Sequence, residues 1–65
     1  MSTIRALRLP EDHEVISIRL EGGLFVAYVG EERIAESLSS RRLGEWGLSF
    51  GALRVRHDYD LREGQ

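Results

Sequence analysis

The sequence of 65 residues contains no cysteine, no lysine and no asparagine. Without cysteine, the chain forms neither disulfide bonds nor thiolate metal sites. All nine basic residues are arginine, and the joint absence of lysine and asparagine is typical of a genome with GC-rich codons. The only histidines, His13 and His57, would need carboxylate partners at unconstrained spacings to hold a metal. We therefore expect structural or surface roles for both histidines, with no metal ligand and no cofactor.

Motifs of catalysis and of membrane insertion are also missing. The sequence has no nucleophile-elbow motif, and the Gly22-Gly23 pair lacks the Lys-Ser/Thr of a phosphate-binding loop. We expect no catalytic residue, no enzymatic activity and no small-molecule substrate. No apolar run approaches the roughly 18 residues of a membrane span, and the N-terminus lacks a secretory apolar region. These absences predict a cytoplasmic protein without membrane contact.

Length and composition predict a single small folded domain over residues 1–65. The sequence is 42% hydrophobic and 31% charged, which is ordinary for a globular domain. A chain this short buries only about 60% of the surface that its unfolded form exposes, so its stability is marginal. The polar tail 61–65 is expected to be frayed.

The pattern of residues 14–30 predicts a β-hairpin around a Gly22-Gly23 turn. Two glycines adopt the positive φ angles of a two-residue type I′ loop without steric cost. This loop pairs Glu21 with Leu24, Leu20 with Phe25, Ile18 with Ala27 and Ile16 with Val29. Because side chains alternate along a strand, one face of the hairpin is entirely apolar. Its members are Ile16, Ile18, Leu20, Phe25, Ala27 and Val29.

The remaining segments predict an α+β fold. Residues 1–9 form a first strand, either at an edge or covered on both faces, that ends at Pro10. Residues 31–43 suit either a helix or a third hairpin strand: the helix is favoured by acidic residues at its start, Arg41 and Arg42 at its end and Gly44 after it. Residues 44–51 form a bent loop that folds Trp46, Leu48 and Phe50 back onto the core, and residues 52–59 form a last strand. The expected architecture is a small antiparallel sheet of about four strands, in the order β-β-β-α-β, with one helix on one face.

Acidic residues cluster in three places: Glu11, Asp12 and Glu14; Glu31, Glu32 and Glu36; and Asp58, Asp60 and Glu63. The first two clusters include the turns at residues 10–14 and 30–32. Both turns lie at the end of the hairpin opposite Gly22-Gly23, and they contribute Glu11, Asp12, Glu14, Glu31 and Glu32. Such an end is complementary to an arginine- and lysine-rich groove that normally holds nucleic acid. We therefore predict a partner-binding site that blocks the functional surface of a protein. The alternative is that these charges form only solvated surface, with weak pairs of about 0–1 kcal/mol.

The arginines and the second hairpin face support two other interpretations. Arg54 and Arg56 project from one face of the last strand and could bind phosphates, as in a small nucleic-acid-binding regulator. The formal net charge of −2 weakens that hypothesis because nucleic-acid-binding proteins are usually basic. The outer hairpin face carries apolar residues that a second copy could cover in a two-fold homodimer. These residues are Val15, Leu24, Val26 and Tyr28.

In its small size, its lack of cysteine and catalytic residues and its compact α+β pattern, the chain resembles the small inhibitor proteins of bacteriophages, including anti-CRISPR proteins. The resemblance covers the whole chain and implies a non-enzymatic blocker of a bacterial protein, such as a nucleic-acid-binding effector. Some members of that group present carboxylates in place of DNA phosphates. The net charge of −2 departs from the strongly acidic proteins that work in that way.

Overall fold

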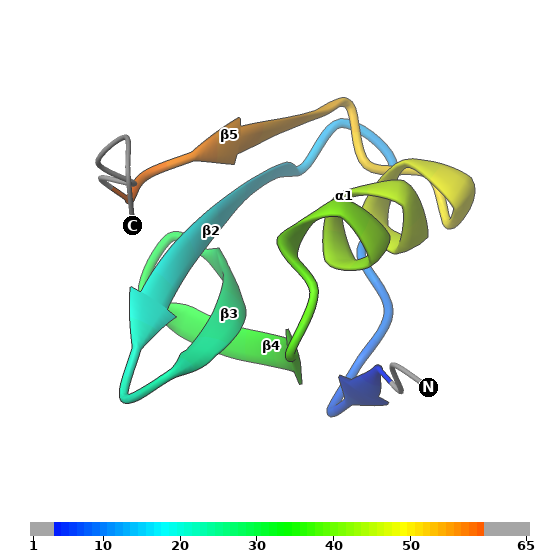
Figure 1. Ribbon diagram of the computed structural model, residues 1–65. Helices are drawn as coiled ribbons and strands as arrows, with labels where there is room; N and C mark the ends of the chain where they lie inside the picture. Colours follow the sequence, from blue (N-terminus) through cyan, green and yellow to red (C-terminus); the bar gives the residue numbers. More distant parts are fainter. Residues whose placement is uncertain (1–3, 60–65) are drawn as a thin grey trace.

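The computed structural model describes residues 4–59, which form one helix and a five-stranded sheet (Figure 1). The elements are β1 (Arg5–Ala6), β2 (Val15–Glu21), β3 (Leu24–Val29), β4 (Glu32–Ser37), α1 (Ser40–Ser49) and β5 (Arg54–His57). The predicted α+β class, with one helix on one face of a small sheet, is confirmed. The described part of the chain has one strand more than expected, in the order β-β-β-β-α-β. The prediction for residues 61–65 lies outside the described residues.

The hairpin of β2 and β3 has the predicted register. Ile18 pairs with Ala27, Leu20 with Phe25 and Glu21 with Leu24. Gly22 and Gly23 have φ angles of 56° and 83°, as a two-residue turn with positive φ at both central positions requires. The turn residues and the alternating pattern therefore specify this part of the fold locally.

Strand β4 continues the sheet beyond β3, so the strand alternative is correct for residues 32–37. A β-bulge interrupts the pairing of β3 with β4, because Ala27 pairs with Ala35 while Tyr28 pairs with Arg33. Ile34 is the additional residue between them. The bulge lets Ile34 and Ala35, which are neighbours in sequence, both point into the core, where they are 0% and 1% exposed.

Helix α1 lies later in the chain than expected. The predicted loop over residues 44–51 is wrong, because most of that segment is helical. Ser39 caps the helix: its hydroxyl accepts a hydrogen bond from the backbone N–H of Arg42 at 3.2 Å. The first turn carries Arg41 and Arg42 and no acidic residue, which is the unfavourable charge order for a helix macrodipole. The helix is therefore stabilised by its cap and by packing rather than by its terminal charges.

The C-terminus of α1 is a Schellman motif centred on Gly51. The N–H of Ala52 donates to the carbonyl of Gly47 at 3.0 Å, and the N–H of Gly51 donates to the carbonyl of Leu48 at 3.3 Å. Gly51 has a φ of 107°, a conformation that favours glycine. Gly51, and not Gly44, is thus the residue that follows the helix.

Strand β5 makes the sheet mixed instead of antiparallel. It pairs with β2 in parallel, in the register Val15 with Arg54 through Ile18 with His57. The sheet order is β1-β4-β3-β2-β5, so β1 and β5 are its two edges. The N-terminal strand lies at an edge, the first of the two predicted alternatives, although it spans only Arg5–Ala6 among the described residues.

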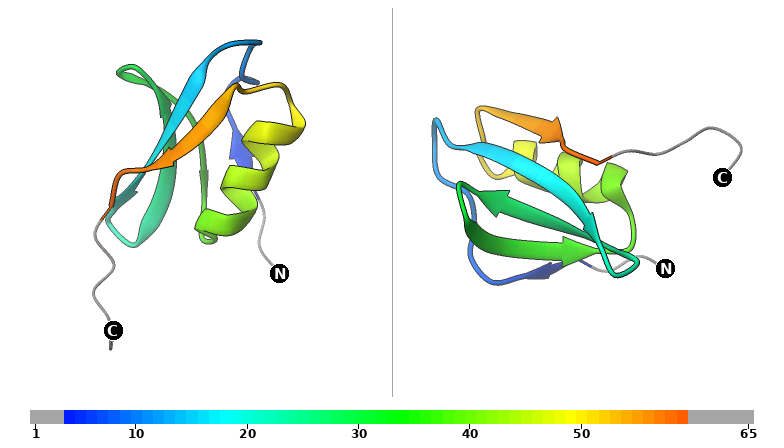
Figure 2. Two further views of the ribbon diagram at one scale, coloured as in Figure 1. Left: turned by 90° about the horizontal axis from the view of Figure 1, so that it is seen from above. Right: turned by 90° about the vertical axis from the view of Figure 1, so that its left-hand side faces the viewer.

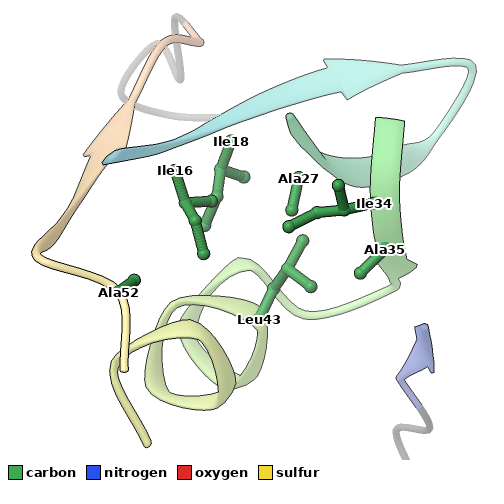
Figure 3. Close-up of a cluster of buried hydrophobic side chains, with 7 residues drawn as sticks. All are labelled: Ile16, Ile18, Ala27, Ile34, Ala35, Leu43 and Ala52. Atoms are coloured by element: carbon green, nitrogen blue, oxygen red, sulfur yellow. The ribbon is translucent and has the colours of Figure 1, made fainter. Parts of the chain in front are cut away.

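The core lies between α1 and one face of the sheet (Figures 2 and 3). Seven buried residues form it: Ile16, Ile18, Ala27, Ile34, Ala35, Leu43 and Ala52. Trp46 packs against this cluster as expected, but Leu48 and Phe50 are about half exposed, so their predicted return to the core is wrong. Leu20, expected on the apolar face, is 41% exposed at the tip of the hairpin.

Candidate functional site

The two acidic turns meet at one end of the molecule, which we call the acidic end (Glu11, Asp12, Glu14, Glu31 and Glu32). Arg8, in the segment between β1 and β2, joins the turns. Its guanidinium donates to both carboxylate oxygens of Glu14 at 3.1 and 3.2 Å and to both oxygens of Glu32 at 3.1 and 3.2 Å. It also donates to the carbonyl of Leu9 at 3.0 Å. One planar cation thus binds a carboxylate from each turn, a geometry that suits arginine and not lysine.

The first acidic turn is further fixed by its own hydrogen bonds. The carboxylate of Glu14 accepts the backbone N–H of Glu11 at 2.8 Å, and the N–H of Glu14 donates to the carbonyl of Glu11 at 3.1 Å. His13, exposed in this turn, has a φ of 59°, which non-glycine residues adopt uncommonly. The hydrogen bonds from Arg8, followed by that from Glu11, hold the pKa of Glu14 below its ordinary value. The same carboxylates raise the pKa of Arg8.

The other three acidic residues, Glu11, Asp12 and Glu31, are exposed. Among residues 4–59, none of these three forms an ion pair. Arg8 thus joins Glu14 of the first predicted turn to Glu32 of the second. The sequence pattern did not reveal this role of Arg8. One signal could have indicated this role. Two adjacent acidic turns favour a cation between them, and Arg8 is close in sequence to the first turn, which begins at Pro10.

The face of the sheet opposite α1, here called the outer face, carries Arg54 and Arg56. Their neighbours on β5, Val55 and His57, point toward the helix, where they approach Gly44. Alternation along the strands places arginines from four strands on the outer face. By the pairing register these arginines are Arg5, Arg19, Arg33, Arg54 and Arg56.

Several outer-face arginines already have partners. Arg19 lies over the ring of Tyr28 at 4.5 Å, and the Tyr28 hydroxyl donates to Glu21 at 2.9 Å. Arg56 lies 3.4 Å from Asp58. Arg33 pairs closely with Glu36, which Arg5 also approaches at 3.7 Å. Within the described residues Arg54 forms no ion pair.

The apolar residues proposed for a homodimer interface also lie on the outer face. Val26 is only 1% exposed there, although α1 packs on the opposite side. In the register its neighbours are Arg19 on β2 and Glu36 on β4, whose long aliphatic stems suit the covering of an apolar residue. Val15, Leu24 and Tyr28 are partly exposed. The area left for a second copy is therefore smaller than the sequence indicates.

Residues 4–59 contain no group of three or more histidine, cysteine or acidic side chains with the geometry to hold a metal ion. His57 lies on β5, where its Nδ1 is 3.0 Å from the hydroxyl of Tyr59. No helix in this part of the chain has the length and apolar character needed to cross a membrane. Charged and hydrogen-bonding groups gather at two places on the described surface, the acidic end and the outer face.

Comparisons with protein-family models, with curated proteins and with solved structures found no significant match.

Proposed function

We propose that this chain is a cytoplasmic, non-enzymatic binding protein that inhibits or regulates a bacterial protein by covering a basic surface of that partner. The contact surface is the acidic end. The observation that carries the proposal is the double engagement of Arg8, which ties Glu14 and Glu32 together. Two turns that are distant in sequence are thereby presented as one fixed surface.

Fixing these turns matters because binding by mobile loops loses affinity to the cost of ordering them. The hydrogen bonds around Arg8 and Glu14 order the acidic end before any partner arrives. Glu11, Asp12 and Glu31 then remain exposed for contact. A groove rich in arginine and lysine, such as the nucleic-acid site of an effector, is the complementary partner surface.

The test is affinity capture from a bacterial lysate with the wild-type chain and with the triple variant Glu11→Arg, Asp12→Arg, Glu31→Arg. We expect the wild type to retain a partner that elutes with salt and with competing DNA, and the variant to lose it. A matched control is Glu45→Arg, which reverses an exposed charge on α1 outside the acidic end. Circular dichroism of each variant establishes that the fold is retained. Equal capture by the folded triple variant would contradict the proposal.

The arginines of the outer face favour a second candidate, a small nucleic-acid-binding regulator that uses Arg54 and Arg56. The supporting observation is that arginines from four strands share an open sheet face with Tyr28. Aromatic and guanidinium groups on such a face suit stacking and phosphate contacts. A gel-shift titration of DNA and RNA at low salt tests this function. Absence of retardation at high micromolar protein removes it, and retardation that Arg54→Glu with Arg56→Glu abolishes supports it.

A further inference from the structure

Strand β5 presents an open edge of the sheet. It pairs with β2 on one side, and no other strand among residues 4–59 lies on its other side. Figure 1 shows β5 as the outermost strand beside β2, at the opposite edge from β1. An edge strand has backbone N–H and C=O groups that an extended chain can pair with. β5 is thus a place where the sheet can grow by one strand.

A groove of about 530 Å³ lies between this edge and α1. Its helical wall is the row Ser40, Gly44 and Leu48, which share one side of α1 at four-residue spacing. Gly44 lines the groove where α1 lies against β5: a Cβ atom there would lie 3.7 Å from Val55 and 3.9 Å from His57. Leu48 is 54% exposed and gives the wall an apolar surface. The groove therefore accepts apolar side chains from a strand added beside β5.

The charges around the groove select an acidic partner. Two arginines, Arg41 and Arg54, line it, against a single carboxylate from Glu45. The pair of Arg41 with Glu45 is long, at 3.4 Å, and both side chains are mostly exposed, so it neutralises Arg41 weakly. Arg56 adds a further guanidinium on the outer side of the same strand, where it lies 3.4 Å from the carboxylate of Asp58. An extended segment with carboxylates is the complementary ligand.

A second copy of this chain is a poor occupant of the same edge. If two β5 strands paired about a two-fold axis centred on Val55, Arg54 of each copy would face Arg56 of the other. If the axis passed through Arg56, that residue would face itself. Like charges directly opposite one another destabilise a strand pair. In these two registers the arginines of β5 disfavour self-pairing, and they favour a partner of opposite charge.

We infer that β5 and the α1–β5 groove bind an extended peptide segment that alternates apolar and acidic residues, by adding it as a sixth strand. Alternation sends the apolar side chains toward Gly44 and Leu48 and the carboxylates toward Arg54 and Arg56 on the outer face. Backbone hydrogen bonds to β5 supply affinity, and the groove and arginines supply specificity. This inference does not rest on the function proposed for the acidic end.

The probe is a blocked heptapeptide of the sequence Glu-Val-Glu-Val-Glu-Val-Glu, titrated into the ¹⁵N-labelled chain and followed by NMR. We expect saturable shifts that centre on residues 54–57 and on the Gly44–Leu48 side of α1. Amide hydrogen exchange in β5 should slow at least tenfold at saturation, because new backbone hydrogen bonds protect it. Leu48→Glu, and separately Arg54→Glu with Arg56→Glu, should each weaken binding at least tenfold. All three residues are exposed, so these variants are expected to fold.

Two control peptides and one control variant make the result decisive. A peptide of the same composition without alternation, and one with lysine in place of each glutamate, should both fail to bind. The triple variant of Glu11, Asp12 and Glu31 should bind the probe as the wild type does, which separates this site from the acidic end. The inference is overturned by absence of saturable binding. It is equally overturned by equal binding of a control peptide, or by unchanged hydrogen exchange in β5 at saturation.

Discussion

Gly47 of helix α1 lies so close to Ile16 of strand β2 that a Cβ atom at Gly47 would sit 2.5 Å from the Cδ1 atom of Ile16. Ile16 is fully buried, so its Cδ1 atom would have to shift within the core to admit a methyl group at Gly47. The absence of a side chain at this position lets the helix approach the sheet. A helix-disfavouring residue is here a requirement of packing.

Gly47→Ala should therefore destabilise the protein by about 1–3 kcal/mol through overpacking. Gly44→Ala is the matched control, because its new methyl group would meet Val55 at an ordinary contact distance of 3.7 Å. That variant should be unchanged or more stable by about 0.5–1 kcal/mol, because alanine favours the helix. Urea denaturation of both variants measures the difference. Equal effects of the two substitutions would contradict the close approach of Gly47.

Leu43→Ala should cost about 2–5 kcal/mol of unfolding free energy, because Leu43 is fully buried beneath α1 and its truncation leaves a cavity. Leu48→Ala on the same helix should stay within about 0.5 kcal/mol of the wild type, because Leu48 is 54% exposed. Thermal and urea unfolding of the pair test which face of α1 packs on the sheet. A larger loss of stability for Leu48→Ala than for Leu43→Ala would contradict the assignment of the Leu43 side of α1 as its buried face.

Arg8→Met should lower the melting temperature by a few degrees, because it leaves the carboxylates of Glu14 and Glu32 adjacent without their shared cation. Arg41→Met provides the control: its pair with Glu45 is long and both side chains are mostly exposed. Differential scanning calorimetry at low and high salt compares them. We expect the Arg8 variant to lose more stability than the Arg41 variant, and a loss of the same size in both would contradict the central role of Arg8.

The acid dependence of stability should include a contribution from Glu14. Its pKa in the folded chain lies below the ordinary value of 4.5, chiefly because Arg8 donates hydrogen bonds to its carboxylate. A lowered pKa stabilises the fold at pH values above 4.5, and this stabilisation is lost as the pH falls through the pKa of the folded state. Glu14→Gln should be less stable than the wild type at neutral pH, and the difference should shrink on acidification. Urea titrations across this range would contradict the prediction if the difference stayed constant.

The hairpin could be predicted from sequence because its determinants are local. The glycine turn fixes the register, and alternation assigns the faces of β2 and β3. The position of α1 could not be predicted in the same way. Gly44 and Gly47 are typical of a loop, and Arg41 and Arg42 are typical of a helix end. In the structure, the Ser39 cap and the packing of Gly47 against Ile16 place all four residues inside the helix. The Schellman glycine, Gly51, was the local signal that could have corrected this.

The candidate sites were predictable to a similar extent. Turns 10–14 and 30–32 could be placed at one end because both flank the same hairpin. The binding of Arg8 to both of them depends on where β1 lies in the sheet, which local patterns do not specify. The parallel pairing of β5 with β2 likewise depends on contacts between residues distant in sequence. Because the α1–β5 groove exists only with this pairing, it could not be predicted from local patterns.

The parallel pairing of β5 with β2 also has a consequence expected for folding. The β2–β3 hairpin brings together residues that are close in the chain and can pair early. In the sequence, β3, β4 and α1 lie between β2 and β5, so the pairing of β5 with β2 closes the largest loop in the sheet. We therefore expect the open edge and its groove to form late in folding. A ligand held there would distinguish a completely folded chain from a partly folded one and would stabilise only the former.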